Sequence, residues 1–285
     1  MVDLIYRTTK GLRNYRNPLS IACRRLLRSH FINVVDRRTG LRFRCRRGAD
    51  VMMAETLHAH IYDLEFAPLR AGDVVFDIGA NHGFYSCWAA FQGATVHAFE
   101  PDHDSVELLQ YNIRANGLEN KIHVHPLAIA ASSGKANLFC SPQLGGGMNT
   151  IIPEFAEKAG VDITSFSRVN TITLADALAH CNVTRLRTCK LDCEGAELSI
   201  LQAMESETRE KIEAFVMEFH PEAYELSQLM GLLLGWDGYH VSKVRSHEVA
   251  NANLAVVRSD LIKQWSGETE PGDRAPSQVP SERDE

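Results

Sequence analysis

An apolar run that breaks into glycines, at residues 74–86, constrains the fold of this chain more than any other stretch. Residues 74–78 are rich in β-branched and aromatic side chains, which is typical of a strand buried on both faces. Gly79 and Gly83 follow, and a helical pattern begins at Phe84. Because glycine has no Cβ, such a loop lets the backbone approach a ligand closely, and the free amides of the helix start face an anionic group. The stretch predicts a strand, a glycine-rich loop and a helix beside a nucleotide-like ligand.

A second apolar strand, at residues 95–99, ends in an acidic residue. Glu100 follows this strand, about twenty residues after Gly79, and an acid at this position of a βαβ unit accepts hydrogen bonds from the ribose hydroxyls of an adenosine group. The loop has the spacing Gly79-x-x-x-Gly83 and lacks the G-x-G-x-x-G pattern of dinucleotide binders. S-adenosylmethionine, which has a ribose but no phosphate, therefore fits this loop better than a nicotinamide dinucleotide does.

The order of the remaining patterns predicts the fold class. A helical pattern over residues 51–67 leads into the first strand, and the chain then reads βαβαβ, an excursion, βαβα, and two strands at 239–244 and 254–258. Alternating strands and helices are typical of a doubly wound, mostly parallel sheet that binds ligands at the carboxyl ends of its strands. The closing antiparallel hairpin favours the Rossmann-like sheet of a class I methyltransferase over a nicotinamide-binding sheet. We expect this α/β domain to span residues 51–262.

Residues 1–50 are expected to form a basic N-terminal extension. Residues 1–47 hold 13 Lys and Arg against two acids, so the overall charge of −6 leaves −17 on the remainder. A basic amphipathic helix that starts at Asn17-Pro18, and a hairpin that turns at residues 36–40, are predicted within it. Such an arm either folds against its own acidic domain or makes peripheral contact with an anionic membrane. We expect no nucleic-acid partner.

The cysteines and the hydropathy pattern bear on the cellular setting. The seven cysteines are odd in number and contain no CxxC pair, which argues against a disulfide framework or a zinc ribbon and favours a reducing, cytoplasmic setting. No run approaches the roughly 18 apolar residues of a membrane span, and the sequence predicts neither a signal peptide nor an anchor. Residues 263–285 are rich in charge and proline and are expected to form a disordered acidic tail.

Several sequence motifs resemble those of a known family. These motifs are Asp77-Ile78-Gly79-Ala80-Asn81-His82-Gly83-Phe84-Tyr85-Ser86, Phe99-Glu100-Pro101, Asn112 with Asn116, Lys190-Leu191-Asp192-Cys193-Glu194-Gly195-Ala196-Glu197, and Glu218-Phe219-His220. With them the chain resembles the FkbM family of S-adenosylmethionine-dependent methyltransferases over roughly residues 50–260. The resemblance implies a Rossmann-like methyltransferase domain and, usually, O-methylation of a hydroxyl on a sugar, glycolipid, polyketide or related small molecule. It covers neither the basic arm nor the acidic tail.

The first half of the domain is expected to bind the cofactor. Asp77 is placed to face the ammonium of its methionine part, Glu100 to hold the ribose, and the backbone near Leu127 to meet the adenine edge. The residues that we assign to S-adenosylmethionine are Asp77, Gly79, Asn81, Gly83, Ser86, Glu100, Leu127 and Ala128.

The strands that end at Asp192 and His220 are neighbours in the doubly wound order, and they supply the expected catalytic groups. Period-two alternation places Lys190, Asp192 and Glu194 on one face, and it places Glu218 with His220 on the neighbouring strand. Because unpaired buried charges are costly, Lys190 is expected to pair with Glu218, while Asp192, Glu194 and His220 converge at the pocket rim. His220 titrates nearest neutrality and is a candidate base, with Asp192 acting directly or orienting it. Alternatively, His220 caps its strand and Glu194 satisfies loop amides.

Other interpretations stay open at this point. The glycine-rich residues 143–149 form either a flexible connector or a substrate lid. Asp192 and Glu194 suit Mg²⁺, but no clear third ligand is evident and we predict no metal; His123 and His125 are interpreted as structural. Besides the small-molecule O-methyltransferase, the chain fits a nicotinamide-dependent oxidoreductase or a non-catalytic adenosyl-binding adaptor. The acceptor and the oligomeric state are not indicated.

Overall fold

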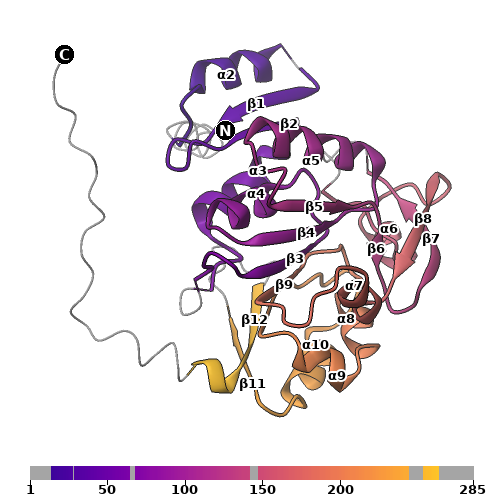
Figure 1. Cartoon of the computed structure of the whole chain (residues 1–285). Coiled ribbons are helices and arrows are strands. Elements are labelled where there is room, and N and C mark those ends of the chain that lie inside the picture. Colours follow the sequence, from indigo (N-terminus) through magenta and orange to yellow (C-terminus); the bar gives the residue numbers. More distant parts are fainter. Residues whose placement is uncertain (1–13, 28, 65–67, 142–146, 244–252, 263–285) are drawn as a thin grey trace.

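The central element of the computed structural model is a seven-stranded sheet with the order β11-β12-β10-β9-β3-β4-β5 (Figure 1). The structure describes residues 14–27, 29–64, 68–141, 147–243 and 253–262. The strands are β3 (Val74–Ile78), β4 (Thr95–Phe99), β5 (Ile122–His125), β9 (Thr188–Leu191), β10 (Ala214–Glu218), β11 (Tyr239–Lys243) and β12 (Asn253–Arg258). Strands β5, β4, β3, β9 and β10 run parallel to one another, and β12 is antiparallel to both β10 and β11. The predicted Rossmann-like class I methyltransferase sheet is confirmed.

The two faces of this sheet carry two hydrophobic cores, as expected for strands buried on both sides. On one face Val75 of β3 packs with helices α4 (Phe84–Phe91) and α5 (His103–Ala115). On the other face Phe76, the next residue, packs with α7 (Leu174–His180), α8 (Glu197–Gln202) and α10 (Leu226–Leu234). A short helix, α9 (Ser206–Glu210), leads into β10. Because β4 and β9 flank β3 on opposite sides, the chain reverses direction across the sheet at β3, and ligands bind at the carboxyl ends of strands at such a point.

The N-terminal region is a helix and a hairpin that join the first core. Helix α2 (Pro18–Leu26) precedes strands β1 (Phe31–Val35) and β2 (Arg42–Arg46), which pair antiparallel as predicted. Ile32 and Phe43 on the inward face of the hairpin are buried and belong to the core that contains α4 and α5. The first 13 residues of the expected arm and the expected tail at 263–285 lie outside the described residues.

The helix predicted over residues 51–67 is wrong in extent. Helix α3 (Asp50–Ala54) continues into a π-helical turn, η1 (Glu55–Ala59), and ends at His60, which adopts a left-handed conformation with φ of 56°. A positive φ at a residue other than glycine is uncommon and breaks the helical hydrogen-bond pattern. The chain turns there, and Tyr62 then points toward the centre of the sheet's carboxyl edge; residues 65–67 lie outside the described part.

The excursion between β5 and β9 forms a separate three-stranded sheet. Its strands are β6 (Ala128–Ile129), β7 (Gly134–Phe139) and β8 (Phe166–Ile172), in the order β6-β8-β7, and α6 (Pro153–Lys158) lies between β7 and β8 in the chain. Figure 1 shows this small sheet beside the carboxyl ends of β4 and β5. Of its elements, β6 and α6 have two and six residues, which is too short for a sequence periodicity to emerge.

Candidate active site

Two loops at the carboxyl edge of the sheet touch at Gly79. Gly79 follows β3 with φ of 73°, and a Cβ built on it would lie 1.8 Å from the backbone oxygen of Asp192, which follows β9. No larger residue fits this contact, so glycine is required here by the approach of the neighbouring loop as well as by its positive φ. The loops after β3 and β9 therefore form one continuous wall.

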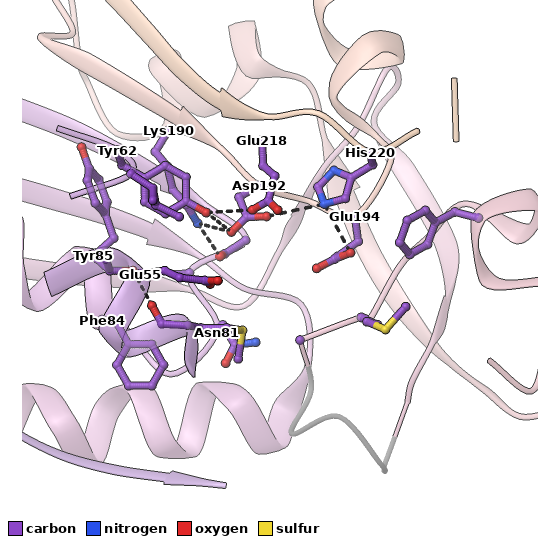
Figure 2. Close-up of a pocket in the computed structure, with 18 of the residues that line it drawn as sticks. Glu55, Tyr62, Asn81, Phe84, Tyr85, Lys190, Asp192, Glu194, Glu218 and His220 are labelled. Carbon is purple, nitrogen blue, oxygen red and sulfur yellow. Dashed lines mark hydrogen bonds and ion pairs between the residues drawn. The ribbon is translucent and has the colours of Figure 1, made fainter. Parts of the chain in front are cut away.

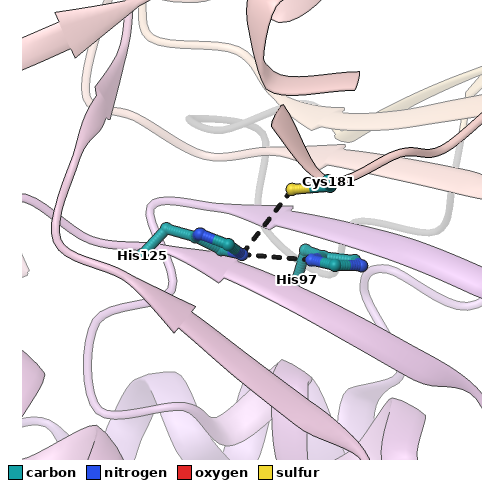
Figure 3. A group of neighbouring side chains, drawn as sticks. All are labelled: His97, His125 and Cys181. Carbon is teal, nitrogen blue, oxygen red and sulfur yellow. Dashed lines mark hydrogen bonds between the residues drawn. The ribbon is translucent and has the colours of Figure 1, made fainter. Parts of the chain in front are cut away.

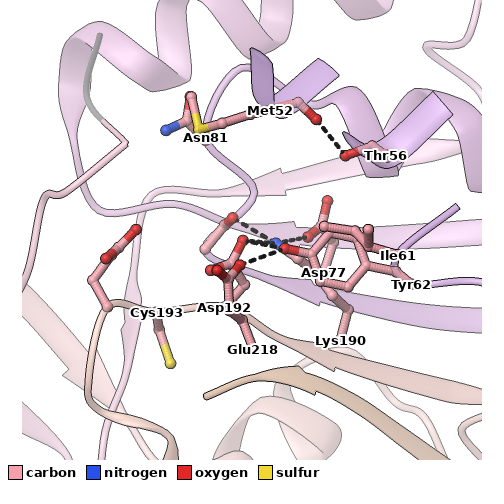
Figure 4. Close-up of polar contacts among 12 residues, drawn as sticks. Met52, Thr56, Ile61, Tyr62, Asp77, Asn81, Lys190, Asp192, Cys193 and Glu218 are labelled. Atoms are coloured by element: carbon pink, nitrogen blue, oxygen red, sulfur yellow. Dashed lines mark hydrogen bonds and ion pairs between the residues drawn. The ribbon is translucent and has the colours of Figure 1, made fainter. Parts of the chain in front are cut away.

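The buried side chain of Lys190 contacts both of these loops (Figure 4). Its ammonium donates to the backbone oxygen of Gly79 at 2.9 Å and lies 3.2 Å from both Asp77 Oδ1 and Asp192 Oδ2. Burial opposes the charge, but Asp192 and Asp77 raise the pKa of Lys190 above its usual value. Lys190 is thus a buried cation balanced by these two aspartates, whereas the sequence predicted Glu218 as its partner. The carboxylate of Glu218 instead lies 3.2 Å from the hydroxyl of Tyr62.

The sequence assigned Asp77, Ser86 and Gly83 to the cofactor, but the structure surrounds each of them with other parts of the protein. Asp77 is fully buried, and its second oxygen accepts a 2.5 Å hydrogen bond from Ser86, which is also fully buried. The carboxylate is neutralised by Lys190 and is not available to an ammonium group of a ligand. Gly83 has φ of 81°, and a Cβ there would lie 2.3 Å from Leu109 of α5, so this glycine serves the packing of α5. These three predictions are corrected to structural roles.

The first half of the candidate site is a largely apolar pocket that ends at Glu100. Its lining includes Gly79, Asn81, Glu100, Phe99, Leu127, Ala128, Ile129, Asp192 and Glu194. The Glu100 carboxylate accepts hydrogen bonds from the backbone amides of Asn81 and Asp102, both at 2.8 Å. Burial raises the pKa of Glu100 to about 7, although these amides oppose the shift. An apolar lining with one carboxylate at its edge offers surface to an adenine ring and a hydrogen-bond acceptor to ribose hydroxyls.

The second half is a carboxylate-rich cavity of about 280 Å³ that shares Gly79, Asn81, Asp192 and Glu194 with the first (Figure 2). Its further lining includes Met52, Glu55 and Tyr62 from the N-terminal side, and Lys190, Glu218, His220 and Glu222 from β9, β10 and the segment after β10. Figure 2 shows Tyr62, Asp192, Glu194 and His220 arranged around one space. The expected convergence of Asp192, Glu194 and His220 is therefore observed.

His220 is held between three acidic side chains. Its Nδ1 lies 3.1 Å from Glu197 Oε1, and its Nε2 lies 3.4 Å from Glu194 Oε2 and 3.9 Å from Asp192 Oδ1. Burial alone would lower the pKa of His220, but the carboxylates, with Glu197 first, raise it well above the usual value. An imidazole that is already protonated donates rather than accepts a proton. This geometry makes His220 the cation of the cavity rather than the base that the sequence suggested.

Glu197 explains how the loop after β9 keeps its shape. It is fully buried and accepts from the backbone amides of Cys193 at 2.8 Å and Gly195 at 3.1 Å, and from the hydroxyl of Tyr224 at 3.2 Å. Burial would raise the pKa of Glu197, but His220 and the backbone amide of Cys193 lower it. Glu197 therefore satisfies the loop amides, a role that the sequence left to Glu194.

Glu194 differs from Asp192 and Glu197 because the pKa of its carboxyl is raised, whereas the pKa values of the other two are lowered. It adopts a left-handed conformation with φ of 53°, which turns its side chain out of the strand direction and toward His220. Burial, followed by the neighbouring Asp192 and Glu218, raises the pKa of Glu194 well above the usual value, against the opposing effect of His220. A carboxylate with a raised pKa is a stronger proton acceptor than an ordinary one.

Asp192 is more tightly held. Tyr62 donates a 2.8 Å hydrogen bond to Asp192 Oδ2, and Lys190 contacts the same oxygen. Burial works against ionisation, yet Lys190 and His220 lower the pKa of Asp192. One oxygen of Asp192, one of Glu218 and a nitrogen of His220 all lie within 4.8 Å of one another. Three ligand-type atoms thus face one another, but a protonated His220 has no lone pair to offer a divalent cation, so no metal is assigned to this set.

The described end of the glycine-rich loop reaches both halves of the site. Gly147 lines both pockets, Met148 lines the acidic cavity and Asn149 lines the apolar one. The hydroxyl of Thr150 donates a 2.7 Å hydrogen bond to the backbone oxygen of Glu194. The loop is thus attached to the segment that carries Glu194; residues 143–146 lie outside the described part, and the choice between connector and lid stays a prediction.

Sequence reasoning missed the contribution of the N-terminal side. Met52 and Glu55 come from α3 and η1, and Tyr62 comes from the turn that replaces the predicted helix. No spacing pattern indicates that a residue 130 positions before Asp192 donates to it.

Within the described residues, no helix is long and apolar enough to cross a membrane.

A match to a family model and similarities to named relatives identify the family of this chain. Residues 77–244 match the family described as Methyltransferase FkbM domain. The 31-O-demethyl-FK506 methyltransferase FkbM of Streptomyces tacrolimicus is 26% identical over 193 residues, which cover 59% of this chain and 73% of that protein. Methyltransferase sdnD of Sordaria araneosa is 25% identical over 195 residues, 60% of this chain and 74% of that protein. The solved methyltransferase FkbM of Methylobacillus flagellatus KT aligns with a TM-score of 0.45 and 16% identity over 69% of this chain and 49% of that one, so this chain spans about half its length.

Proposed function

The chain belongs to the FkbM methyltransferase family, and from this premise we propose that it transfers the methyl group of S-adenosylmethionine to a hydroxyl of a sugar, glycolipid or polyketide-type small molecule. The observation that carries the proposal is the pair of adjoining pockets, one apolar with Glu100 at its edge and one rich in carboxylates. They share Gly79, Asn81, Asp192 and Glu194, so a ligand in the first half presents its end to the second.

The residues of the apolar half fit the cofactor. Glu100 would accept from the ribose hydroxyls, while Phe99, Leu127 and Ile129 offer apolar surface to the adenine ring. Gly79 keeps the wall free of a side chain where the two halves meet. When bound, S-adenosylmethionine supplies an electrophilic methyl group on a sulfonium, and its transfer to oxygen is an in-line displacement that depends on positioning.

The residues of the acidic half fit a hydroxyl-bearing acceptor. Hydroxyl groups donate to carboxylates, and Asp192, Glu194 and Glu218 offer acceptor oxygens around one cavity. We assign to Glu194 the proton that the hydroxyl loses, because its pKa is raised, whereas that of Asp192 is lowered and His220 is already cationic. Asp192, fixed by Tyr62 and Lys190, would orient the hydroxyl. One relative is named as the methyltransferase of 31-O-demethyl-FK506, which supports oxygen as the acceptor atom.

Calorimetry with two cofactor classes tests the cofactor assignment. Titration of the full chain with S-adenosylhomocysteine is expected to give one equivalent of binding, and titration with a nicotinamide dinucleotide is expected to give none. The reverse result would replace the proposal with an oxidoreductase. A labelled methyl donor incubated with glycolipid, polysaccharide and polyketide fractions then identifies the acceptor.

A pair of glutamate variants tests the catalytic assignment. We expect Glu194→Gln to lower kcat by about 10²- to 10⁴-fold, the usual contribution of a general base, while the Kd for S-adenosylhomocysteine stays within a few-fold. Glu119→Gln is the control, because Glu119 is an exposed glutamate that lines neither pocket; its kcat is expected to stay near that of the unmodified enzyme. Unchanged turnover in Glu194→Gln would remove Glu194 from the mechanism. An unmodified chain that binds S-adenosylhomocysteine but methylates none of the fractions would instead be an adenosyl-binding adaptor.

A further inference from the structure

Figure 3 shows a second cluster of ligand-type side chains: His97, His125 and Cys181. His97 pairs in register with Phe76, whose side chain packs with α7, and none of the three residues lines the acidic cavity. His97 comes from β4, His125 from β5, and Cys181 is the residue that ends α7. His97 Nδ1 lies 3.0 Å from His125 Nε2, and Cys181 Sγ lies 3.6 Å from the same nitrogen. All three side chains are partly buried, and their ligand atoms lie within 4.8 Å of one another.

These separations match the edges of a zinc coordination tetrahedron. With Zn–N of about 2.0–2.1 Å and Zn–S of about 2.3 Å, a tetrahedral site places nitrogen about 3.6 Å from sulfur and two nitrogens about 3.3 Å apart. The observed sulfur to nitrogen distance is 3.6 Å, and the 3.0 Å between the nitrogens needs to open by only a few tenths of an ångström. We propose that His97, His125 and Cys181 bind one Zn²⁺ ion, with a solvent molecule in the fourth position.

Hydrogen bonding alone accounts for this cluster less well. A neutral imidazole nitrogen has one in-plane lone pair, or else one N–H, yet both His97 Nδ1 and Cys181 Sγ approach the single atom His125 Nε2. A cation placed between the three atoms uses the lone pair of each and removes the competition. Burial, followed by neighbouring histidines, lowers the pKa values of His97 and His125 to about 4, so both rings are neutral, the form that ligates metals.

The surroundings indicate what such an ion does. The ring of His125 stacks on Phe99 with centroids 4.7 Å apart, and Phe99 lines the apolar pocket. The backbone oxygen of His125 also accepts from the amide of Leu127, another residue of that lining. An ion that joins β4, β5 and the end of α7 would therefore hold one wall of the apolar pocket in place. This is a structural role, and it is independent of the proposed methyl transfer.

When Zn²⁺ binds, the thiol of Cys181 loses its proton to the buffer and the sulfur forms the bond to the metal, so no oxidant or reductant is needed.

A metal titration tests the site: chelator-treated full-length protein is titrated with Co²⁺ and then with Zn²⁺. We expect one equivalent of Co²⁺ to give the visible bands of a tetrahedral site together with a thiolate-to-cobalt charge-transfer band, and Zn²⁺ to displace it. Zn²⁺ is also expected to raise the Tm of the protein.

Cysteine variants locate the site. Cys181→Ser is expected to lose the charge-transfer band and to weaken Zn²⁺ binding by about 100-fold or more, since removal of even an outer-shell partner typically costs about 10- to 100-fold. Cys140→Ser is the matched control, because Cys140 is also a partly buried free thiol with its pKa raised to about 11, as for Cys181; it is expected to bind as the unmodified chain does. His97→Gln is expected to weaken binding while keeping the thiolate band. Absence of stoichiometric binding in the unmodified chain, or equal losses in Cys181→Ser and Cys140→Ser, would overturn the proposal.

Discussion

At the scale of single residues, Glu100 couples cofactor binding to pH. Its folded-state pKa is raised from 4.5 to about 7 by burial, so near neutrality the carboxyl is partly protonated. Ribose hydroxyls donate to the ionised carboxylate. At a pH below the pKa of Glu100, ligand binding must be accompanied by loss of the carboxyl proton, which weakens the measured affinity. The affinity for an adenosyl ligand should therefore rise with pH and level off above about pH 7.

We predict that the Kd for S-adenosylhomocysteine decreases as the pH is raised from about 6 to about 8, by up to about tenfold for each unit below the pKa. Calorimetry at several pH values measures the effect. In Glu100→Gln, which has no proton to lose, binding should be weaker and should show no such slope. A Kd that is equal at both pH values in the unmodified protein would contradict the assignment of Glu100 to the ribose.

The same scale shows which site residues a sequence can reveal. Asp192, Glu194 and His220, which follow the ends of neighbouring strands, were predicted to meet because parallel strands end at one edge of the sheet. The protonation state of His220 was not predictable, because it depends on Glu197, which reaches it through the fold of the loop after β9. Asp77 was misassigned for a related reason, since its neutralising partner, Lys190, comes from the adjacent strand.

At the scale of elements, two asparagines attach the N-terminal hairpin to the domain. Asn112 of α5 accepts from the amide of Arg44 at 2.7 Å and donates to the oxygens of Arg44 and His82. Asn116, one turn later, repeats the pattern with the amide and oxygen of Arg42. Amide side chains thus take the place of a neighbouring strand along β2, and they satisfy backbone groups that would otherwise lack partners.

We predict that Asn112→Ala lowers the free energy of unfolding by about 2–3 kcal/mol, because the side chain is fully buried and its loss leaves backbone groups unpaired. Asn116→Ala is the control, because Asn116 makes the equivalent contacts with the backbone of Arg42 in a less buried position, where water can replace the amide. This variant should lower the free energy of unfolding by about 1 kcal/mol or less. Urea unfolding monitored for both variants gives the comparison, with the midpoint shifting and the slope unchanged. Equal losses in the two variants would show that burial is not the deciding factor.

Elements were predictable where their periodicity was long. Strands β3 and β4 coincide with their predicted ranges, residues 74–78 and 95–99, since each has at least one apolar face to bury. The segment at residues 51–67 failed because local helical propensity continues past His60, while tertiary contacts turn the chain so that Tyr62 reaches Asp192. Short elements such as β6 are defined only by their pairing, here with β8.

At the scale of the whole molecule, the basic N-terminal region cannot be treated as a detachable arm. Ile32 is fully buried and Phe43 is 2% exposed, and both belong to the core formed with α4 and α5. Deletion of residues 1–47 would therefore damage the fold, and a loss of membrane binding in such a truncation would carry no information. What the region does present to solvent is a pair of leucines at its helix: Leu19 and Leu27 are each 81% exposed.

We propose that this end of the molecule makes peripheral contact with anionic membranes, and we predict that the double variant Leu19→Ser, Leu27→Ser lowers the partition onto phosphatidylserine vesicles at least about tenfold. Each buried leucine contributes roughly 1.5 kcal/mol or more to such binding, and the arginines around it add an attraction that salt screens. The matched control changes Leu226 and Leu234 of α10, which are 40% and 71% exposed at a different element, and it should sediment as the unmodified chain does. If both double variants bind vesicles equally, the basic charge serves the chain's own acidic body instead.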